Sequence, residues 1–549
     1  MTITTAVATA GHITWLLVFA NSGGDLAAQD AWAEFVGRHP DSAYNLAWYG
    51  GMHPVSYSVI SPYLMSTLGV RTTMMIAGTL SAVLLALIFV RVRAVRSPLP
   101  PALVGVFAFL SNAVSGRVTF ALGMMFGLAA VAVVFCWPHR WRGKRRTKAV
   151  VAALLAGLAT AGSPVAGLFV GVVAAALFLS RRRPAAYALG VAPVGVVALS
   201  AWLFPFSGTQ PISIWTASLP TVYAVLVFLL VPDGWKTVRI AAAVYGFGTV
   251  LTWLIDSQIG SNVTRFALVF AGPVLLATLP YVRRHSRQWI SIVVALVGFV
   301  CWGSVKAAID VVHTASAASW ARELAPLLDQ LERMDAEKGR VEVVPARSHR
   351  EASALAPYVN LARGWNRQAD LERNPLFYDG TLDSTNYRKW LRRWAVHYVV
   401  LPAVDPDESG MREAELVQKG QPYLRKVWHD AHWKLYQVRK PAPLADPPAT
   451  VDRTGAGELT IHVKTAGTVL IRVAYSPWLG LVDSDGRIIK PPETDENGKG
   501  FVNKDGCLVK AEQDEAGDEW TRLLAPKPGL YRLAAPYEFP RGTPCPDSG

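Results

Sequence analysis

Three side chains that could move a proton or bind a cation follow the first apolar run of the chain. They are Asp25, Gln29 and Asp30 in the stretch "GGDLAAQDAW", and helical spacing places Asp25 and Gln29 on one face. A carboxylate at such a position can accept a proton from an attacking hydroxyl group. The alternative is that Asp25 caps a helix and Asp30 is solvated. Asp25 and Asp30 are therefore candidates for a general base, and Gln29 is a candidate for substrate binding.

Arginines in short turns between apolar runs are candidates for binding an anion. Arg117 lies in "SNAVSGRVTF" and Arg265 in "GSNVTRF". A guanidinium group there could hold a phosphate through charge-assisted, bidentate hydrogen bonds. Snorkelling of a long side chain from a helix end is the alternative explanation. Arg363, far along the chain in "NLARGWNRQAD", is a third candidate for the same role.

Two stretches mix aromatic and planar polar side chains, a mixture that suits sugar recognition because rings stack on sugars while amides and guanidinium groups bind hydroxyls. They are "WYGGMHPVSYSV" and "ARGWNRQAD", and their candidates for substrate binding are Tyr49, His53, Tyr57, Trp365, Arg367 and Gln368. A structural loop without a ligand is the alternative. We expect the first stretch to lie in the membrane interface. The histidines do not fall at the spacing of metal ligands, so no metal site is predicted.

The elements that must position these residues are membrane helices followed by a water-soluble region. The chain has 549 residues, of which 52% are hydrophobic and only 17% charged, and the apolar residues concentrate in the first three hundred. We expect about eleven spans in a helical domain covering residues 1–305, because backbone inside a bilayer must satisfy its own hydrogen bonds. The predicted spans are 4–20, 72–92, 102–114, 118–137, 150–160, 165–180, 186–204, 219–231, 240–255, 266–281 and 290–305.

Basic residues in every second loop predict the orientation of these spans. The clusters lie near residues 91–96, 140–148, 181–183, 236–239 and 283–287, and the positive-inside rule places them in the cytoplasm together with the N-terminus. Residues after about Ser304 would then lie outside the cell. The net charge of +14 is accordingly a topology signal, and nucleic acid is not an expected partner.

The external region is expected to contain two domains. We expect residues 306–440 to form an α/β domain, with strands at "RVEVVP", "HYVVLP" and "WKLYQV". After the proline-rich linker "KPAPLADPP", residues 450–549 alternate apolar and polar side chains, which predicts a small antiparallel β-sandwich. Cys507 and Cys545 both fall in this oxidising compartment and are expected to form a disulfide, with two free thiols as the alternative.

The sequence contains no Walker A motif, no GxGxxG after a strand, no GxSxG and no HExxH. A nucleotide-driven pump, an α/β-hydrolase and a zincin therefore lose support.

The chain resembles the GT-C superfamily of polytopic glycosyltransferases, which use lipid-phosphate-linked sugars. The similarity lies in the acidic first external loop, "GGDLAAQDAW", in the many spans with short turns and in the C-terminal external domain. High-GC bacterial membrane proteins of this type carry stretches like "WYGGMHP", "SGRVTFALG", "GSPVAGLF" and "ARGWNRQAD". The resemblance implies a bacterial plasma-membrane enzyme of cell-wall biogenesis that moves a sugar from a polyprenyl phosphate to an envelope glycan or lipid acceptor.

The same resemblance implies residue roles. The first-loop acid would be the general base, on Asp25 with Asp30 as competitor, and the arginines Arg265 and Arg117 would hold the departing lipid phosphate. Because this loop lacks the adjacent pair of acids that is common in the superfamily, a divalent metal (Mg or Mn) stays open as a cofactor. Membrane lipids, a lipid-linked sugar donor and an envelope glycan acceptor are the implied partners.

Two other classes of protein remain as alternatives. A secondary transporter or flippase of envelope lipids or glycans would share the spans and basic loops, but internal repeats and midplane charges, which such proteins usually show, are not visible. A non-catalytic scaffold that binds glycan through its β-domain would not depend on Asp25.

Overall fold

The computed structural model describes residues 1–20, 24–141, 143–315, 323–493, 501–514 and 516–546. It divides the chain into two compact units. Unit 1 comprises residues 1–29 and 55–315, and unit 2 comprises residues 30–54 and 316–549. The units differ from the expected domains in three respects: the α/β region and the terminal β region belong to one unit, residues 30–54 join it, and unit 1 ends at residue 315 where the expected helical domain ends at 305.

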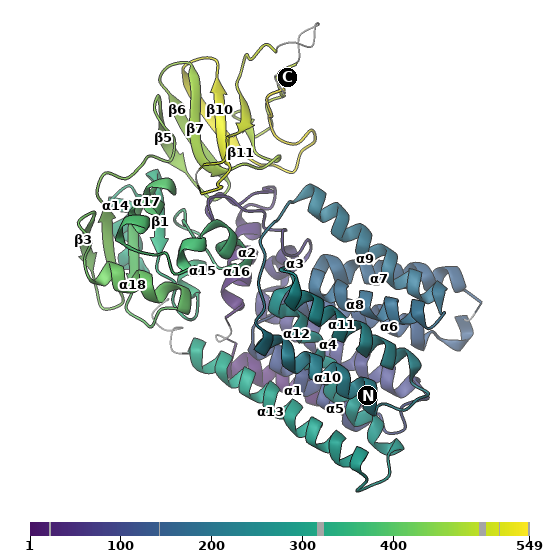
Figure 1. The fold of residues 1–549 in the computed structure, drawn as a ribbon. Helices are drawn as coiled ribbons and strands as arrows, with labels where there is room; N and C mark the ends of the chain where they lie inside the picture. Colours follow the sequence, from purple (N-terminus) through teal and green to yellow (C-terminus); the bar gives the residue numbers. More distant parts are fainter. Residues whose placement is uncertain (21–23, 142, 316–322, 494–500, 515, 547–549) are drawn as a thin grey trace. The chain divides into compact units, whose positions relative to one another are not determined.

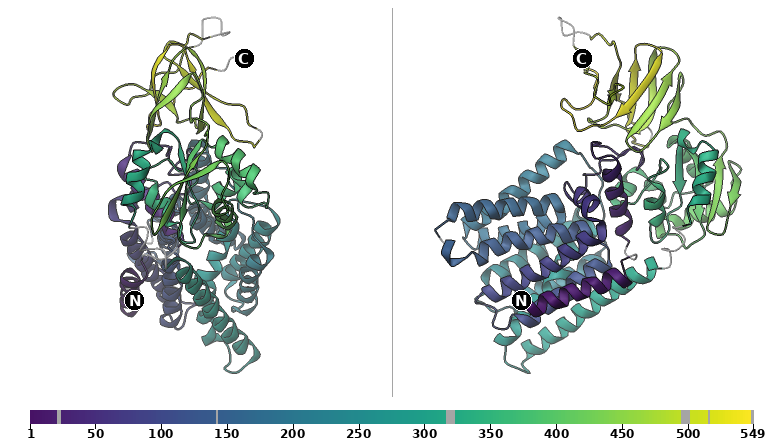
Figure 2. Two further views of the ribbon diagram at one scale, coloured as in Figure 1. Left: turned by 90° about the vertical axis from the view of Figure 1, so that its left-hand side faces the viewer. Right: turned by 180° about the vertical axis from the view of Figure 1, so that it is seen from behind.

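Unit 1 is a bundle of apolar helices that lie side by side (Figure 1). Its helices are α1 (Thr2–Val18), the start of α2 (Leu26–Arg38), α3 (Ser61–Leu68), α4 (Val70–Arg91), α5 (Leu99–Val114), α6 (Val118–Cys136), α7 (Arg145–Gly162), α8 (Pro164–Leu179), α9 (Arg183–Leu203), α10 (Ile214–Leu230), α11 (Lys236–Leu254), α12 (Thr264–Thr278) and α13 (Arg287–Ala315). Short 3-10 turns at Gly260–Val263 and Leu279–Tyr281 flank α12. Figure 2 shows α13 running along one side of this bundle.

The chain has membrane-spanning helices. Among the described residues, six helical stretches are long and apolar enough to cross a bilayer: Val70–Arg91, Val118–Cys136, Arg183–Leu203, Lys236–Leu254, Gly260–Tyr281 and Arg287–Val312. Four shorter apolar helices accompany them: Thr2–Val18, Leu99–Val114, Pro164–Leu179 and Ile214–Leu230. The span predicted at 150–160 falls within α7, whose first turn is basic. The total of eleven stays a prediction.

Small residues let the helices of unit 1 approach closely, as is usual where lipid gives no hydrophobic drive to association. A Cβ atom on Gly123 of α6 would lie 2.8 Å from the carbonyl oxygen of Ala159 in α7. The corner between α7 and α8 is in turn joined to the start of α3. There the Ser61 hydroxyl donates to the carbonyl of Gly162 at 2.9 Å.

Unit 2 begins with a four-stranded mixed sheet and its helices. The strands β1 (Arg340–Val343), β2 (Val396–Pro402), β3 (Leu424–His429) and β4 (Trp433–Val438) lie in the order β1-β2-β4-β3, and β1 pairs with β2 in parallel. The helices are α14 (Ala325–Arg333), α15 (Arg350–Leu355), α16 (Arg367–Arg373), α17 (Ser384–Arg393) and α18 (Met411–Gln418). The three strands predicted for this region are β1, β2 and β4.

Two antiparallel sheets form the last hundred residues. Strands β5 (Ala449–Thr454), β6 (Glu458–Val463), β11 (Gly529–Ala534) and β8 (Gly480–Val482) make one sheet in the order β5-β6-β11-β8. Strands β7 (Gly467–Ala474), β10 (Trp520–Ala525) and β9 (Cys507–Lys510) make the other, in the order β7-β10-β9. A disulfide joins Cys507 in β9 to Cys545 near the C-terminus.

The aromatic stretch "WYGGMHPVSYSV", which we expect in the membrane interface, is divided between the two units after residue 54. Trp48 and Tyr49 are 1% and 0% exposed within unit 2. The hydroxyl of Tyr49 donates to the carbonyl of Gly364 at 3.1 Å. These aromatic side chains are core residues of unit 2, which explains why they are so apolar.

Candidate active site

The carboxylate of Asp25 in unit 1 lies between two arginines from different helices. Its Oδ2 atom is 3.4 Å from Nη2 of Arg265 and 3.7 Å from Nε of Arg117. Arg117 immediately precedes α6, and Arg265 lies in the first turn of α12. The arginine side chains are 15% and 10% exposed, whereas Asp25 is 39% exposed. The structure therefore brings together three residues that are far apart in the sequence, with the acid as the most accessible member.

Gln29 fixes the start of α2 against the turn that carries Arg117. Its side-chain amide donates to the carbonyl of Gly116 at 3.1 Å, and its Oε1 accepts from the backbone N–H of Thr119 at 3.1 Å. Leu26 packs on the same turn so tightly that a Cβ atom on Gly116 would lie 2.6 Å from Leu26 Cγ, and Gly116 has φ +74°. Only glycine meets both conditions without strain. The sequence marked Gln29 for substrate binding, and the structure shows it positioning this turn.

Arg265 also contacts an aromatic ring. Its guanidinium carbon lies 5.3 Å from the ring centroid of Phe120, in the first turn of α6, within the range of a cation–π contact. Tyr57, also in unit 1, interacts electrostatically with Arg117.

Two charged residues of α13 complete the cluster, and the sequence analysis did not include them. Asp310 accepts a hydrogen bond from the Ser115 hydroxyl at 2.5 Å, and Lys306 Nζ lies 3.7 Å from its Oδ1 atom. Lys306 also interacts electrostatically with Arg117, Asp25 and Arg265. The signal was present in "GSVKAAIDVV", since two ionisable residues four apart inside an apolar run indicate a functional site. The predicted span ended at residue 305 and left both outside.

The cluster is suited to an anion. Arg117, Arg265 and Lys306 face Asp25 and Asp310, which leaves one positive charge in excess among these five residues. The helix N-termini of α6 and α12 add partial positive charge at the two arginines. A small cavity is lined by Arg117, Arg265 and Lys306 together with Ser111, Asn112, Ser115 and Phe120.

Asp30, the competing candidate for the base, belongs to unit 2. Its carboxylate accepts a hydrogen bond from the guanidinium of Arg350, and the side chains are 23% and 12% exposed. The boundary between the units falls between Gln29 and Asp30, inside α2. The charge of Asp30 is therefore engaged by an arginine of unit 2.

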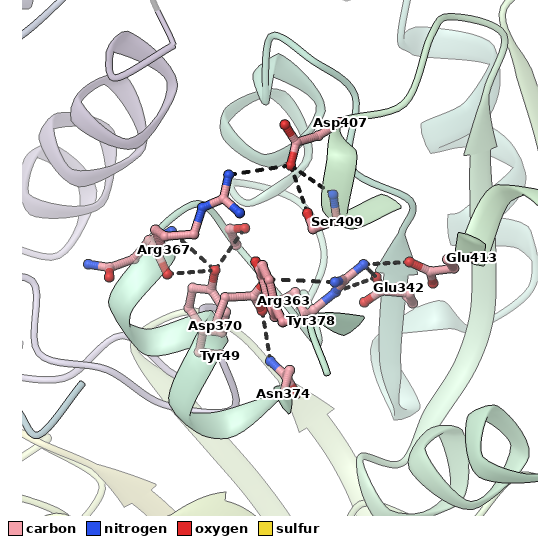
Figure 3. A network of polar contacts seen from close by, with 12 residues as sticks. Tyr49, Glu342, Arg363, Arg367, Asp370, Asn374, Tyr378, Asp407, Ser409 and Glu413 are labelled. Atoms are coloured by element: carbon pink, nitrogen blue, oxygen red, sulfur yellow. Dashed lines mark hydrogen bonds and ion pairs between the residues drawn. The ribbon is translucent and has the colours of Figure 1, made fainter. Parts of the chain in front are cut away.

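Arg363 does not fit the anion-binding role that its sequence context predicted. Figure 3 shows its guanidinium group between the carboxylates of Glu342 and Glu413, with Nη2 at 2.7 and 2.5 Å from their oxygens. Asp370 adds a third carboxylate, 3.7 Å from Nη1. The Arg363 side chain is only 2% exposed. Three carboxylates would repel a phosphate, so we assign Arg363 to the core of unit 2.

Burial also governs the protonation of this network. Desolvation raises the pKa of Glu342 well above its ordinary value, and that of Glu413 is raised for the same reason. The Tyr387 hydroxyl donates to Glu413 at 2.7 Å, and that of Tyr378 donates to Asp370 at 2.6 Å.

The remaining sugar-binding candidates also lie in unit 2, where they pack on protein groups. His53 is 5% exposed, and its Nδ1 atom lies 2.7 Å from the carbonyl of Ala43, while burial lowers its pKa to about 4. Trp365 stacks on His349 at 3.3 Å between ring centroids. Arg367 lies 3.7 Å from Asp407, and Gln368 is 7% exposed. Their roles in substrate binding stay predictions.

Within the described parts of the chain, no group of three or more His, Cys, Asp or Glu side chains is arranged to hold a metal ion. The cluster around Asp25 contributes two carboxylates, and cations already engage both.

Comparison with known proteins gives a partial match and two distant structural likenesses. Residues 446–549 match a family described as "Domain of unknown function (DUF8823)", which begins within the linker that precedes β5. No curated protein matches the sequence.

Among solved structures, arabinofuranosyltransferase AftD from Mycobacteria is similar, with a TM-score of 0.42 and 13% identity over 97% of this chain and 61% of that one. This chain thus spans less than two thirds of that protein. ArnT from Cupriavidus metallidurans, in the apo state and bound to undecaprenyl phosphate, has a TM-score of 0.40 and 13% identity over 79% of this chain and 97% of that one. AftD is by its name a glycosyltransferase, the class of enzyme that the sequence resembles. At this level of similarity, these structures do not establish what this chain does.

Proposed function

We propose that this chain is a membrane glycosyltransferase that moves a sugar from a polyprenyl phosphate to an envelope glycan or lipid acceptor at the outer membrane face. The observation that carries the proposal is the position of Asp25 between Arg117 and Arg265, at 3.7 and 3.4 Å. An exposed carboxylate beside shielded guanidinium groups supplies both functions that such a transfer needs: a proton acceptor and a phosphate binder.

In this mechanism the acceptor hydroxyl attacks the anomeric carbon of the donor sugar and inverts its configuration. Its proton passes to a carboxylate oxygen of Asp25 as the new C–O bond forms. The bond between the anomeric carbon and the phosphate oxygen breaks, and its electron pair remains on the phosphate. Arg117, Arg265 and Lys306 stabilise the charge that develops there.

The first test is the transfer of labelled sugar by purified full-length protein from a panel of polyprenyl-phosphate sugars to envelope glycans. Asp25→Asn removes the proton acceptor at nearly constant shape, and we expect it to lower kcat by about 10²–10⁴-fold. Asp30→Asn is the matched control, because Asp30 is bound to Arg350, and it should retain most of the activity.

Two outcomes would contradict the proposal. If Asp30→Asn abolishes transfer while Asp25→Asn retains it, the base is misassigned. If the wild-type protein neither transfers nor hydrolyses any donor but moves labelled lipid across vesicles, a transporter replaces the enzyme.

A further inference from the structure

A second site that could hold a lipid lies in unit 1, at the ends of α8, α11 and α12. A cavity of about 620 Å³ is walled by apolar residues of α4, α6, α11 and α12, among them Ile88, Phe135, Val238 and Ala277. Its volume falls in the range of about 300 to 1,000 Å³ that is usual for ligand sites. A smaller apolar cavity of about 250 Å³ shares Ile88, Val131, Val238 and Val274 with it. The two cavities together extend the apolar space into the bundle.

The rim of this cavity is cationic. Arg181, Arg182 and Lys236 line it, together with the hydroxyl groups of Ser180 and Thr237 and the ring of Trp235. None of the three cations forms an ion pair with a described residue. The positive-inside rule explains why basic residues occur in this loop. It does not explain why they line an apolar cavity.

The local backbone supports a role for the charge at Arg181. This residue adopts φ +59° at the end of α8, where glycine would be the unstrained choice. The backbone N–H of Arg182 donates to the carbonyl of Leu177 at 2.8 Å, and that of Arg181 donates to Phe178 at 2.9 Å. The Thr237 hydroxyl donates to Ser180 at 3.3 Å and joins this turn to the start of α11. The turn is thus a built part of the cavity rim.

We propose that this cavity binds an acidic phosphoglycerolipid, with its phosphate between Arg181, Arg182 and Lys236 and an acyl chain in the apolar space. The charge of the rim matches an anionic head group, and the apolar walls match a hydrocarbon chain. This site is distinct from the cluster around Asp25. Along α12, Arg265 and Ala277 are twelve residues apart, which corresponds to roughly 18 Å of helix.

The test measures how much lipid the purified full-length protein retains after gel filtration, by mass spectrometry of the extracted lipid. Dioleoyl phosphatidylglycerol, dioleoyl phosphatidylcholine and undecaprenyl phosphate are offered separately and in competition. We expect selective retention of phosphatidylglycerol. We expect a loss of about tenfold or more in the triple variant Arg181→Gln, Arg182→Gln, Lys236→Gln.

Two further variants separate this site from general attraction between a basic surface and acidic lipid. Arg283→Gln, Arg284→Gln, Arg287→Gln removes three cations that do not line the cavity, and it should retain lipid as the wild type does. Val238→Phe fills the wall that both cavities share and should lower retention without changing charge. Equal loss in both triple variants, equal retention of phosphatidylcholine, or displacement by undecaprenyl phosphate at equal concentration would overturn the proposal.

Discussion

At the scale of single residues, Asp25 is an accessible carboxylate beside two shielded guanidinium groups, those of Arg117 and Arg265. Arg265 is restrained by both Phe120 and Asp25, so its guanidinium group is already oriented in the absence of a ligand. Such preorganised donors stabilise developing charge effectively, because they need little rearrangement during the reaction. Arg265 should therefore act mainly on the transition state.

This assignment predicts the effect of replacing Arg265. Arg265→Gln should lower kcat for transfer by about 10²–10³-fold, which is typical for the loss of one charge-stabilising donor. Arg265→Lys should recover only part of the rate, because an ammonium group keeps the charge but lacks the planar fork. Steady-state kinetics with a fixed donor measures both. Unchanged kcat in Arg265→Gln would show that Arg265 does not stabilise the transition state, and unchanged KM as well would exclude it from phosphate binding.

At the scale of elements, Gln29 joins the start of α2 to the turn between α5 and α6. The Gln29 side chain is 3% exposed and satisfies two backbone groups of the turn. Breaking these bonds leaves the Thr119 N–H unpaired in a buried position, at a cost of about 1–3 kcal/mol, whereas the Gly116 carbonyl keeps the backbone N–H of Val118 as a donor. The distance between Asp25 and Arg117 depends on this connection.

Gln29→Leu should accordingly lower both the thermal stability of the full-length protein and kcat for transfer. Gln288→Leu is the matched control, because Gln288 donates a single exposed hydrogen bond to the carbonyl of Leu230. Thermal unfolding in detergent and the transfer assay measure the two effects. A variant Gln29→Leu with wild-type kcat would show that the turn positions Arg117 without Gln29.

At the scale of the whole molecule, the sequence predicted membrane helices followed by an α/β region and a β region. Long apolar runs and alternating apolar and polar residues carry this information, because the helices and strands that they form depend on few contacts between residues distant in the sequence. The convergence of Asp25, Arg117 and Arg265 was also predictable, because each follows or precedes a helix at an expected external turn. Strand β8, with only three residues, had too short a pattern to be recognised.

The misassignment of Arg363 has a different origin. Its partners Glu342 and Glu413 lie 21 and 50 residues away in the sequence, and nothing in "NLARGWNRQAD" indicates that two glutamates will face it. The composition of a buried ion-pair network and that of a sugar site are alike. Only the tertiary structure distinguishes them, because it shows the guanidinium group to be 2% exposed.

A buried acid of unit 2, Glu351, should make the stability of the molecule depend on pH. Burial raises the pKa of Glu351 from 4.5 to about 8, so the folded state favours its protonated form. Its contribution to stability is complete below pH 4.5 and is lost as the pH rises towards 8. Glu351→Gln mimics the protonated form and should stabilise the protein at pH 8 by on the order of a few kcal/mol, with little effect at pH 4.5.

Thermal unfolding of the full-length protein across this pH range checks the prediction. Glu415→Gln, at an exposed position of α18, should show no such trend. A difference between Glu351→Gln and the wild type that stays constant with pH would show that Glu351 does not titrate in this window.

Helix α12 carries Arg265 in its first turn and Val274 and Ala277, which line the lipid cavity, in its last turns. Pro273 interrupts its backbone hydrogen bonding between them, because proline has no N–H to donate and crowds the preceding turn. If lipid occupancy changes the bend of α12 at this proline, it also changes the affinity of the Arg265 end for phosphate. Thermodynamic reciprocity then requires that donor binding change the lipid affinity by the same factor. Under the proposed function, the lipid composition around one end of α12 would then set the affinity for the sugar donor at its other end.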